Sequence, residues 1–409
     1  MVTAPLPLTG VRVVECASYV AGPSGGMGLA RLGADVIRVD PIGGAPDVTR
    51  WPLAPSGTSL YWTGLNKGKR SVELNLTTDE GKELLAALIA APGPESGLLL
   101  HNRAGRDWLS DDVLRAHRPD LIHLAVQGRR DGSPALDYTV NATTGIPYLT
   151  GSGTTAVNHT LPAWDLITGS HAATALLAAL WRRQRTGEGA HLRIALEDVA
   201  ITSVADLGWL AEAQLGAPRQ RDGNYVFGTY GDVLTTRDNR HVMVMAMTPR
   251  QWQALQTATG TQPVFDALTT TLRIDLSTED GRYANRRLIS SVLQRWFTDH
   301  DLPKATAALD NAGALHAPYN TIGELAATLE AEHTTGSTDS IVTNTDQPGI
   351  GPVLTARSPI RWDDTAARPA PTAPHLGADT ATVLSGVLGL SDTHIAALIA
   401  KGIAGGTPP

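Results

Sequence analysis

The first forty residues of the chain contain the pattern that most restricts its fold. Residues 11–15 are a short β-branched run, and residues 34–40 are a second one. Between them, residues 22–33 are rich in glycine and small side chains, with apolar residues at helical spacing. Strand, glycine-rich turn, helix and strand make a βαβ unit, which requires parallel strands and a right-handed crossover. The sequence therefore predicts an α/β fold built on a parallel sheet.

The same alternation continues beyond this unit. The pattern predicts helices over 79–91, 111–117, 166–183 and 197–215, and strands over 97–101, 121–126 and 191–195. The segment 139–164 is rich in Thr, Gly, Asn and Pro and is expected to form functional loops.

Changes in composition divide the chain into three segments. Residues 1–220 are expected to form the first part of a large domain, and a polar linker follows at 217–223. Residues 225–326 are expected to form a small α+β domain, with strands at 225–235 and 241–247 before its helices. Residues 327–409 should return to the large domain through a Ser/Thr-rich loop, a strand near 352–362, a Pro-rich linker over 366–376 and helices over 380–390 and 392–401.

Charge and composition exclude several classes of protein. The formal charge of −7 and the pI near 5.9 argue against a general nucleic-acid-binding protein. No apolar run approaches the roughly 20 residues of a membrane span, and the first residues do not resemble a signal peptide. Cys16, the single cysteine, has no partner for an internal disulfide. We expect a cytoplasmic protein without membrane or nucleic-acid partners.

Common cofactor and catalytic motifs are missing from the sequence. Glycines 22, 25, 26 and 28 do not have the G-x-G-x-x-G spacing of a dinucleotide site, although the surrounding pattern is similar. The twelve histidines form no H-E-x-x-H motif, and the chain has no phosphate-binding loop and no G-x-S-x-G elbow. We therefore expect no metal ligands and interpret each isolated histidine as structural.

Two short segments are candidates for binding an anion. In residues 65–71 (LNKGKRS) a glycine separates two lysines, which suits a phosphorylated cofactor but also an ordinary solvated turn. Residues 126–132 (VQGRRDG) follow a predicted strand, where ligands of open parallel sheets gather, and could equally be a plain charged turn.

The third candidate is Asp165, directly before the long helix predicted over 166–183. The simple interpretation is a helix N-cap, because an aspartate there accepts a free helix N–H. The alternative is a covalent nucleophile toward an activated acyl group, with helix N–H groups stabilising the oxyanion that develops. Residue pattern alone leaves both interpretations open.

Four segments in order resemble the signatures of the family III CoA-transferases. They are GVRVVE with AGP and LARLGADVIRVDP (10–41), LNKGKRSVELNL (65–76), Asp165 followed by GSHAATALLAALWRRQRTGEGAHLRIALEDVA (169–200), and PHLGADTATVLSGVLGLS (374–391). Within the family, DYTVN (137–141) and VNHTLPAWD (157–165) resemble members that move CoA between two carboxyl groups of one dicarboxylate. The resemblance spans almost the whole chain.

This resemblance implies a Rossmann-like large domain, a smaller domain and an interlocked, ring-like homodimer. Asp165 matches the family's catalytic aspartate, which would form a mixed anhydride and then an aspartyl-CoA thioester. The expected substrate is a 2-methylfumaryl (mesaconyl) CoA thioester, with CoA moving from C1 to C4. Coenzyme A enters as part of this substrate, and no tightly bound cofactor is expected.

The resemblance also suggests contacts with substrate. Candidate CoA contacts are Val14, Cys16, Ala17, Arg38, Lys67, Lys69, Arg70, Asn102 and Arg106. Gln127 and Gly128 are candidates for positioning the acyl group, and Trp164 for narrowing its pocket.

Two departures bear on the activity. The chain has Ala135, Leu136 and Asp137 where the related racemases carry a catalytic histidine, which disfavours epimerisation. It also lacks the tetraglycine lid of members that use a separate acid. Two alternatives stay open: an intermolecular CoA-transferase acting on another small acid, and a CoA-binding protein without catalysis in which Asp165 only caps a helix.

Overall fold

The computed structural model describes residues 5–93, 95–103, 105–216, 219–335, 340–362 and 368–406. The chain divides into two compact units. The first comprises residues 1–144, 159–211 and 329–409, and the second comprises residues 145–158 and 212–328. Parts of three expected segments lie outside the described residues: 217–218 of the linker, 336–339 of the Ser/Thr-rich loop and 366–367 of the Pro-rich linker.

A six-stranded parallel sheet forms the centre of the first unit, in the order β3-β2-β1-β4-β5-β6. Its strands are β1 (Arg12–Cys16), β2 (Asp35–Asp40), β3 (Arg70–Glu73), β4 (Leu98–His101), β5 (Ile122–Gln127) and β6 (Ala190–Ala195). The expected α/β fold with a parallel sheet is confirmed. The strand order reverses between β1 and β4, and ligands of such sheets bind in the crevice at that switch point.

Helices cover both faces of this sheet. One face carries α1 (Ala21–Arg31), which packs on β1, β2 and β4, and α7 (Ala163–Thr186), which packs on β5 and β6. The other face has an apolar core to which α3 (Asp79–Ala90), α4 (Asp111–His117), α16 (Thr380–Leu388) and α17 (Asp392–Ala400) contribute. Shorter elements of this unit are α2 (Leu60–Leu65), the 3₁₀ turn η1 (Asp107–Leu109), α5 (Asp137–Asn141), α8 (Leu196–Asp206) and the hairpin β10 (Val342–Gln347) and β11 (Gly351–Ala356).

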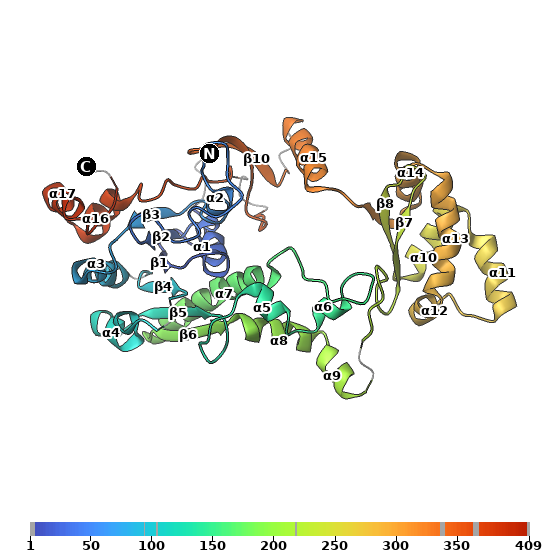
Figure 1. Cartoon of the computed structure of the whole chain (residues 1–409), viewed down its shortest axis with the longest axis horizontal. Coiled ribbons are helices and arrows are strands. Elements are labelled where there is room, and N and C mark those ends of the chain that lie inside the picture. Colours follow the sequence, from blue (N-terminus) through green and yellow to red (C-terminus); the bar gives the residue numbers. More distant parts are fainter. Residues whose placement is uncertain are drawn as a thin grey trace. The chain divides into compact units, whose positions relative to one another are not determined.

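Helices α1 and α7 lie side by side (Figure 1) and approach closely because glycine faces glycine. A Cβ on Gly25 would lie 2.8 Å from the carbonyl oxygen of Gly169, and a Cβ on Gly169 would lie 2.1 Å from Ser24 Oγ. Gly26 faces Glu15 in the same way, at 1.8 Å from Oε2. Gly25 and Gly26 therefore allow α1 to pack closely against α7 and against Glu15 of β1.

Residues near the C-terminus return to the first unit and pair with the outer edge of β3. The Asp379 N–H donates to the Ser71 carbonyl at 2.9 Å, and the Gly405 N–H donates to the Glu73 carbonyl at 3.0 Å. Leu74 and Ala404 form an antiparallel bridge. This edge of the sheet is therefore covered by chain that is distant in sequence.

The second unit has its own core around a three-stranded antiparallel sheet, in the order β7-β8-β9. Its strands are β7 (Tyr230–Thr235), β8 (His241–Ala246) and β9 (Leu315–Pro318). Its helices are α6 (Ile146–Leu149), α9 (Trp209–Gln214, which begins just before the boundary), α10 (Pro249–Thr259), α11 (Gln262–Leu272), α12 (Glu279–Ala284), α13 (Arg286–Asp299), α14 (Leu302–Ala312) and most of α15 (Ile322–Thr334). The range 225–326 expected for a small domain lies inside this unit, which also takes in residues 145–158.

Several sequence-based expectations differ from the structure in detail. The helix expected over 197–215 is two helices, α8 and α9, because Gly208 between them adopts a positive φ of 76°. The strand expected near 352–362 is β11, which among the described residues pairs with β10 in a two-stranded sheet of its own. The expected loops at 139–164 contain α5 and α6. No helix among the described residues is both long and apolar enough to cross a membrane.

Replacing Gly25 by alanine tests the contact between α1 and α7. The added Cβ meets backbone, so we expect a loss of about 1–3 kcal/mol in the free energy of unfolding. Gly28→Ala is the matched control, because a Cβ at Gly28 in the same helix meets nothing within 4 Å. The control should gain up to about 1 kcal/mol from helix propensity. Equal thermal melting shifts in the two variants would contradict this account of the contact.

Candidate active site

Asp165 lies in the first turn of α7 but is not its N-cap. The helix begins at Ala163, and the N-cap is Pro162, which makes no side-chain cap bond. The N-cap interpretation of Asp165 is therefore wrong, because the helix starts three residues earlier than the sequence pattern indicated. The backbone N–H of Asp165 donates instead to Asp137 Oδ2 at 3.0 Å.

The carboxylate of Asp165 is half-buried, and within the described part of the chain it makes no hydrogen bond or ion pair. Burial, followed by the nearby negative charge of Asp137, raises the pKa of Asp165 to about 7. A free carboxylate in a partly dry setting is more nucleophilic than a solvated one, provided that it stays ionised.

Asp137 and Asn141, on α5, hold the segment that leads into α7. His159 Nε2 lies 2.5 Å from Asp137 Oδ1, and Trp164 Nε1 donates to Asn141 Oδ1 at 3.1 Å. Trp164 is buried beside Asp165, and its role in narrowing the acyl pocket stays a prediction. Asp137 and His159 were not among the predicted site residues, although both lie in the two motifs that distinguish this chain within the family resemblance.

Tyr61 on α2 was also missed by the sequence analysis. Burial raises the pKa of its phenol to about 12; the positive charge of Arg50 opposes this shift, and the negative charge of Asp165 adds to it. The Arg50 guanidinium lies over the Tyr61 ring, 5.0 Å from its centroid. A lone tyrosine and arginine in a loop-rich stretch gave no sequence signal for this placement.

Four of the predicted CoA contacts lie at the switch point of the sheet. Val14, Cys16 and Ala17 are buried at the end of β1, and burial raises the pKa of the Cys16 thiol to about 12. Asn102, just after β4, bonds the backbone of Ser18 twice, accepting from its N–H at 3.3 Å and donating to its carbonyl at 3.0 Å. Asn102 thus joins the two loops that border the crevice.

Arg38 and Lys69, two predicted phosphate contacts, are buried within an ion-pair network. Arg38 is 1% exposed and donates to Asp40, Asp47 and Asn66 over 2.7–3.1 Å. Lys69 Nζ donates to both carboxylate oxygens of Glu15, at 2.7 and 2.9 Å, and to Asn66. Burial lowers the pKa of Lys69 to about 8 and raises that of Glu15.

The other cations of the LNKGKRS segment also have protein partners. Lys67 Nζ donates to Thr355 Oγ1 at 3.0 Å, and burial lowers the pKa of Lys67. Arg70 bonds both oxygens of Asp35, at 2.8 and 2.5 Å. Arg38, Lys67, Lys69 and Arg70 therefore help to hold the fold together, and contacts between them and CoA stay predictions.

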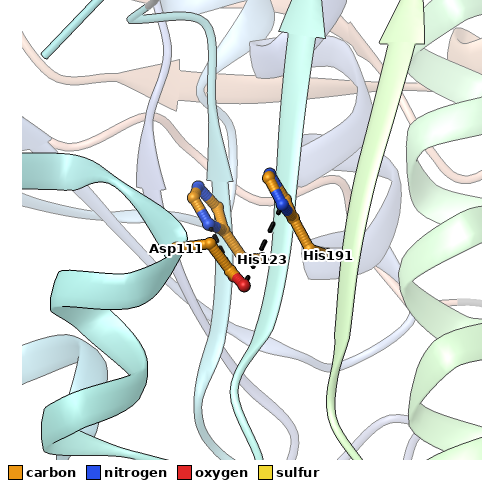
Figure 2. Close-up of side chains that lie close together, drawn as sticks. All are labelled: Asp111, His123 and His191. Carbon is orange, nitrogen blue, oxygen red and sulfur yellow. Dashed lines mark hydrogen bonds and ion pairs between the residues drawn. The ribbon is translucent and has the colours of Figure 1, made fainter. Parts of the chain in front are cut away.

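Arg106 and Gln127 line a second region, a pocket of about 280 Å³ on the α4 side of the sheet. Figure 2 shows Asp111, His123 and His191 in this pocket, brought together by α4, β5 and β6. Gly128 follows Gln127, and its carbonyl accepts the Glu197 N–H at 3.1 Å. A Cβ at Gly128 would lie 2.3 Å from the backbone nitrogen of Ala135, so only glycine fits there.

His101 and His123, both in the lining of this pocket, belong to a chain of hydrogen bonds. The Arg103 N–H donates to His101 Nδ1 at 3.1 Å, so neutral His101 carries its proton on Nε2. That proton faces His123 Nε2 at 2.7 Å, which leaves His123 protonated on Nδ1, 3.2 Å from Asp111 Oδ1. Burial lowers the pKa of His101 to about 3, and that of His123 is lowered as well.

The hydrogen bonds that fix the protons on His101 and His123 compete with metal binding. Donor atoms of Asp111, His123 and His191 lie within 4.8 Å of one another, close enough to surround a cation after small movements. A metal on His123 Nδ1 would displace the proton there and force the bond between Arg103 and His101 to break. Arg115 Nε already donates to Asp111 Oδ2 at 2.6 Å. Hydrogen bonds therefore account for the positions of His123 and Asp111, and His191 stacks on His123 with ring centroids 4.8 Å apart.

Replacing Lys69 by methionine tests whether its charge maintains the fold. Glu15 would lose its cation at a fully buried position, so we expect a loss of about 3–5 kcal/mol in the free energy of unfolding. Lys82→Met is the control, since the partner carboxylate of Lys82, on Asp79, is 93% exposed; its thermal melting should not change. Unchanged melting of Lys69→Met, with only CoA affinity reduced, would show that Lys69 serves the ligand alone.

Replacing Asp165 by asparagine tests the electrostatic setting of this carboxylate. Its folded pKa of about 7 lies above the unfolded value of about 3.9, so the folded state binds the extra proton between these two pH values. The free energy of unfolding should therefore fall as pH rises from 4 to 7, by a few kcal/mol at most. Asp165→Asn removes the cost of burying the ionised carboxylate. The variant should therefore have a higher melting temperature than the native protein at pH 8 and the same melting temperature at pH 4. A constant difference across this range would contradict the raised pKa.

Comparisons with known proteins agree with this geometry. The sequence profile of CoA-transferase family III matches residues 8–380. The chain is 43% identical over 404 residues to 2-methylfumaryl-CoA isomerase of Chloroflexus aurantiacus, covering 98% of both chains. It is 28% identical to succinyl-CoA:mesaconate CoA-transferase of Haloarcula marismortui, over 90% of this chain and 93% of that one.

A solved structure of a CaiB/BaiF family protein from Brucella suis superposes with a TM-score of 0.76 and 26% identity, over 94% of this chain and 100% of that chain. The resemblance expected from the four sequence signatures is confirmed. The family profile matches most of the length of the chain, and the parallel sheet and the free carboxylate of Asp165 agree with this match. The chain belongs to CoA-transferase family III.

Proposed function

We propose that this CoA-transferase moves CoA between the two carboxyl groups of one dicarboxylate, converting 2-methylfumaryl-CoA from its C1 to its C4 thioester. The observation that carries the proposal is Asp165, a half-buried carboxylate without a protein partner among the described residues. The substrate is inferred from the relative of 43% identity, which covers nearly all of the chain.

The reaction divides into two halves that mirror each other. A carboxylate oxygen of Asp165 attacks the thioester carbonyl carbon, the C–S bond breaks, and the CoA thiolate leaves with the electron pair. The thiolate then attacks the aspartyl carbonyl of the mixed anhydride, which gives an aspartyl-CoA thioester and a free dicarboxylate. The second carboxylate of that dicarboxylate attacks the aspartyl thioester, and the same steps run in reverse. No net proton or electron is consumed.

Several features of the chain suit this chemistry. The N-terminus of α7 has the positive end of the helix dipole near Asp165, which favours an attacking carboxylate and a developing oxyanion. We place CoA in the crevice between β1 and β4, where Val14, Cys16, Ala17 and Asn102 lie. Trp164 would restrict the acyl pocket. The homodimer, and contacts from Arg106, Gln127 and Gly128, stay predictions.

Isotope-labelled free acid distinguishes intramolecular from intermolecular transfer. The purified enzyme is incubated with unlabelled mesaconyl-C1-CoA and ¹³C-labelled free mesaconate, and the products are separated by chromatography with mass detection. We expect unlabelled mesaconyl-C4-CoA. Labelled product would show that a separate acid accepts CoA, as in the Haloarcula relative's name, and absence of any C4 product would refute the proposed substrate.

Asp165→Ala is the catalytic control for this assay. It should abolish turnover and leave thermal melting unchanged or raised, because Asp165 holds no other group in place. Asp206→Ala, an exposed aspartate at the end of α8, should retain full activity. An active Asp165→Ala variant would exclude the aspartyl intermediate.

A further inference from the structure

A three-residue connection leads from the nucleophile to an imidazole. The Asp165 N–H donates to Asp137 Oδ2 at 3.0 Å, and Asp137 Oδ1 lies 2.5 Å from His159 Nε2. The three residues come from α7, α5 and the segment between α6 and α7. Both oxygens of the Asp137 carboxylate are thus occupied, one by the backbone of the nucleophile and one by His159.

This arrangement creates an electrostatic problem at Asp165. Asp137 is 1% exposed, and its charge is one of the two causes that raise the pKa of Asp165. Two carboxylates that share a partly dry site do not both ionise readily unless a cation balances them. The reaction requires an ionised Asp165, so a compensating charge beside Asp137 would assist it.

We propose that Asp137 and His159 are positioning residues for the reaction: the His159 imidazolium neutralises Asp137, which holds the Asp165 backbone in place, so that Asp165 stays ionised and aimed at the thioester. This inference rests on the proposed function of Asp165 as nucleophile. In this proposal the charge of His159 matters for the reaction. A hydrogen bond from Nε2 that only connected the loop to α5 would not require that charge.

The imidazole is well placed for this role. Its ring lies 5.7 Å from the ring of Tyr138, edge to face, and 6.4 Å from that of Trp164. Its side chain is 19% exposed, so it can exchange protons with solvent while its position is held. The contact joins Nε2 of the imidazole to the carboxylate oxygen that the Asp165 N–H leaves free.

Other ionisable groups around Asp165 do not replace His159. On α2, Tyr61 contributes a phenol that is held neutral, with Arg50 over its ring. On α8, which also packs against α5, Glu197 pairs with Arg129 at 3.4 Å and Asp198 with Arg130 at 2.7 Å. In α1, the glycine-rich helix against α7, the one ionisable residue is Arg31 at the far end.

Two substitutions that keep the hydrogen bonds but change the charge test the proposal. Asp137→Asn can still accept the Asp165 N–H through its amide oxygen and donate to a neutral imidazole. His159→Gln can still donate to Asp137 through its amide nitrogen, which is about as far from the backbone as Nε2. Tyr138→Phe is the matched control, since it alters the same site without changing charge.

The first readout is the titration of Asp165 and does not depend on turnover. Each variant is prepared once with Asp165 and once with Asp165→Asn, and the melting temperatures of the two proteins are measured from pH 4 to 9. The pH at which their difference in melting temperature is half complete reports the pKa of Asp165. We expect the midpoint to fall by about one pH unit in Asp137→Asn and to rise by about one unit in His159→Gln. Tyr138→Phe should leave it unchanged.

If the contact between Asp137 and His159 were only structural, Asp137→Asn and His159→Gln would both lower stability, and the midpoint of the Asp165 titration would not move in opposite directions. That result would overturn the proposal. If His159→Gln does not fold, His159→Asn provides the same loss of charge. If neither single variant of His159 folds, the test uses Asp137→Asn and the double variant Asp137→Asn with His159→Gln. Asp137→Asn must lower the midpoint of the Asp165 titration, and the double variant must show the same lowered midpoint. An unchanged midpoint in Asp137→Asn overturns the proposal.

The second readout is the acid limb of kcat against pH with mesaconyl-C1-CoA, which should shift in the same directions as the titration. Absence of turnover in the native protein would refute the proposed substrate and leave the titration result standing. Turnover with an unmoved titration would refute the role of Asp137 and His159 and leave the proposed function intact. The two failures are therefore distinguishable.

Discussion

The buried ion-pair network around Lys69 and Arg38 is the constraint on which the rest of the first unit depends. It joins the ends of β1 and β2 to the segment before β3, because Glu15, Asp40 and Asn66 all take part. Asp47, bound to Arg38, also accepts the Tyr19 N–H at 2.9 Å. Burying these charges is costly unless every partner is present, so the network fixes the turn that leads into α1. Helix α7 packs on α1, and the position of Asp165 follows from it.

The site around Asp165 combines rigid support with an unpaired reactive group. The nucleophile's backbone is held by Asp137, and the neighbouring indole is held by Asn141. The carboxylate itself keeps no partner within the described residues, so no hydrogen bond has to break before attack. Enzymes gain much of their rate from groups fixed in this way before the substrate arrives. The short helix α5, only five residues long, supplies both supports.

Local pattern predicted five of the six strands of the parallel sheet and the long helix, because each is an apolar run with a clear period, but it missed β3 (Arg70–Glu73). The family resemblance suggested Lys69 and Arg38 as CoA contacts, and no charge pattern reveals that both are buried in ion pairs. Their contact with CoA stays a prediction. Helix α5 was missed because its polar residues carry no helical period. Asp165 was a candidate from its position before the long helix, where the pattern left an N-cap and a nucleophile open, and the family resemblance favoured the nucleophile. The pairing of Asp137 with His159 depends on residues 22 positions apart, which no local pattern contains.

The covered edge of β3 has a consequence for synthesis of the chain. The backbone partners of Ser71 and Glu73 are Asp379 and Gly405, separated from them by more than three hundred positions. A ribosome makes the whole parallel sheet, the nucleophile and the second unit before it makes these partners. During that interval the nascent chain exposes an unpaired strand edge together with the apolar face that α16 and α17 later cover, the surfaces that invite aggregation. Dependence on chaperones should therefore be concentrated late in translation.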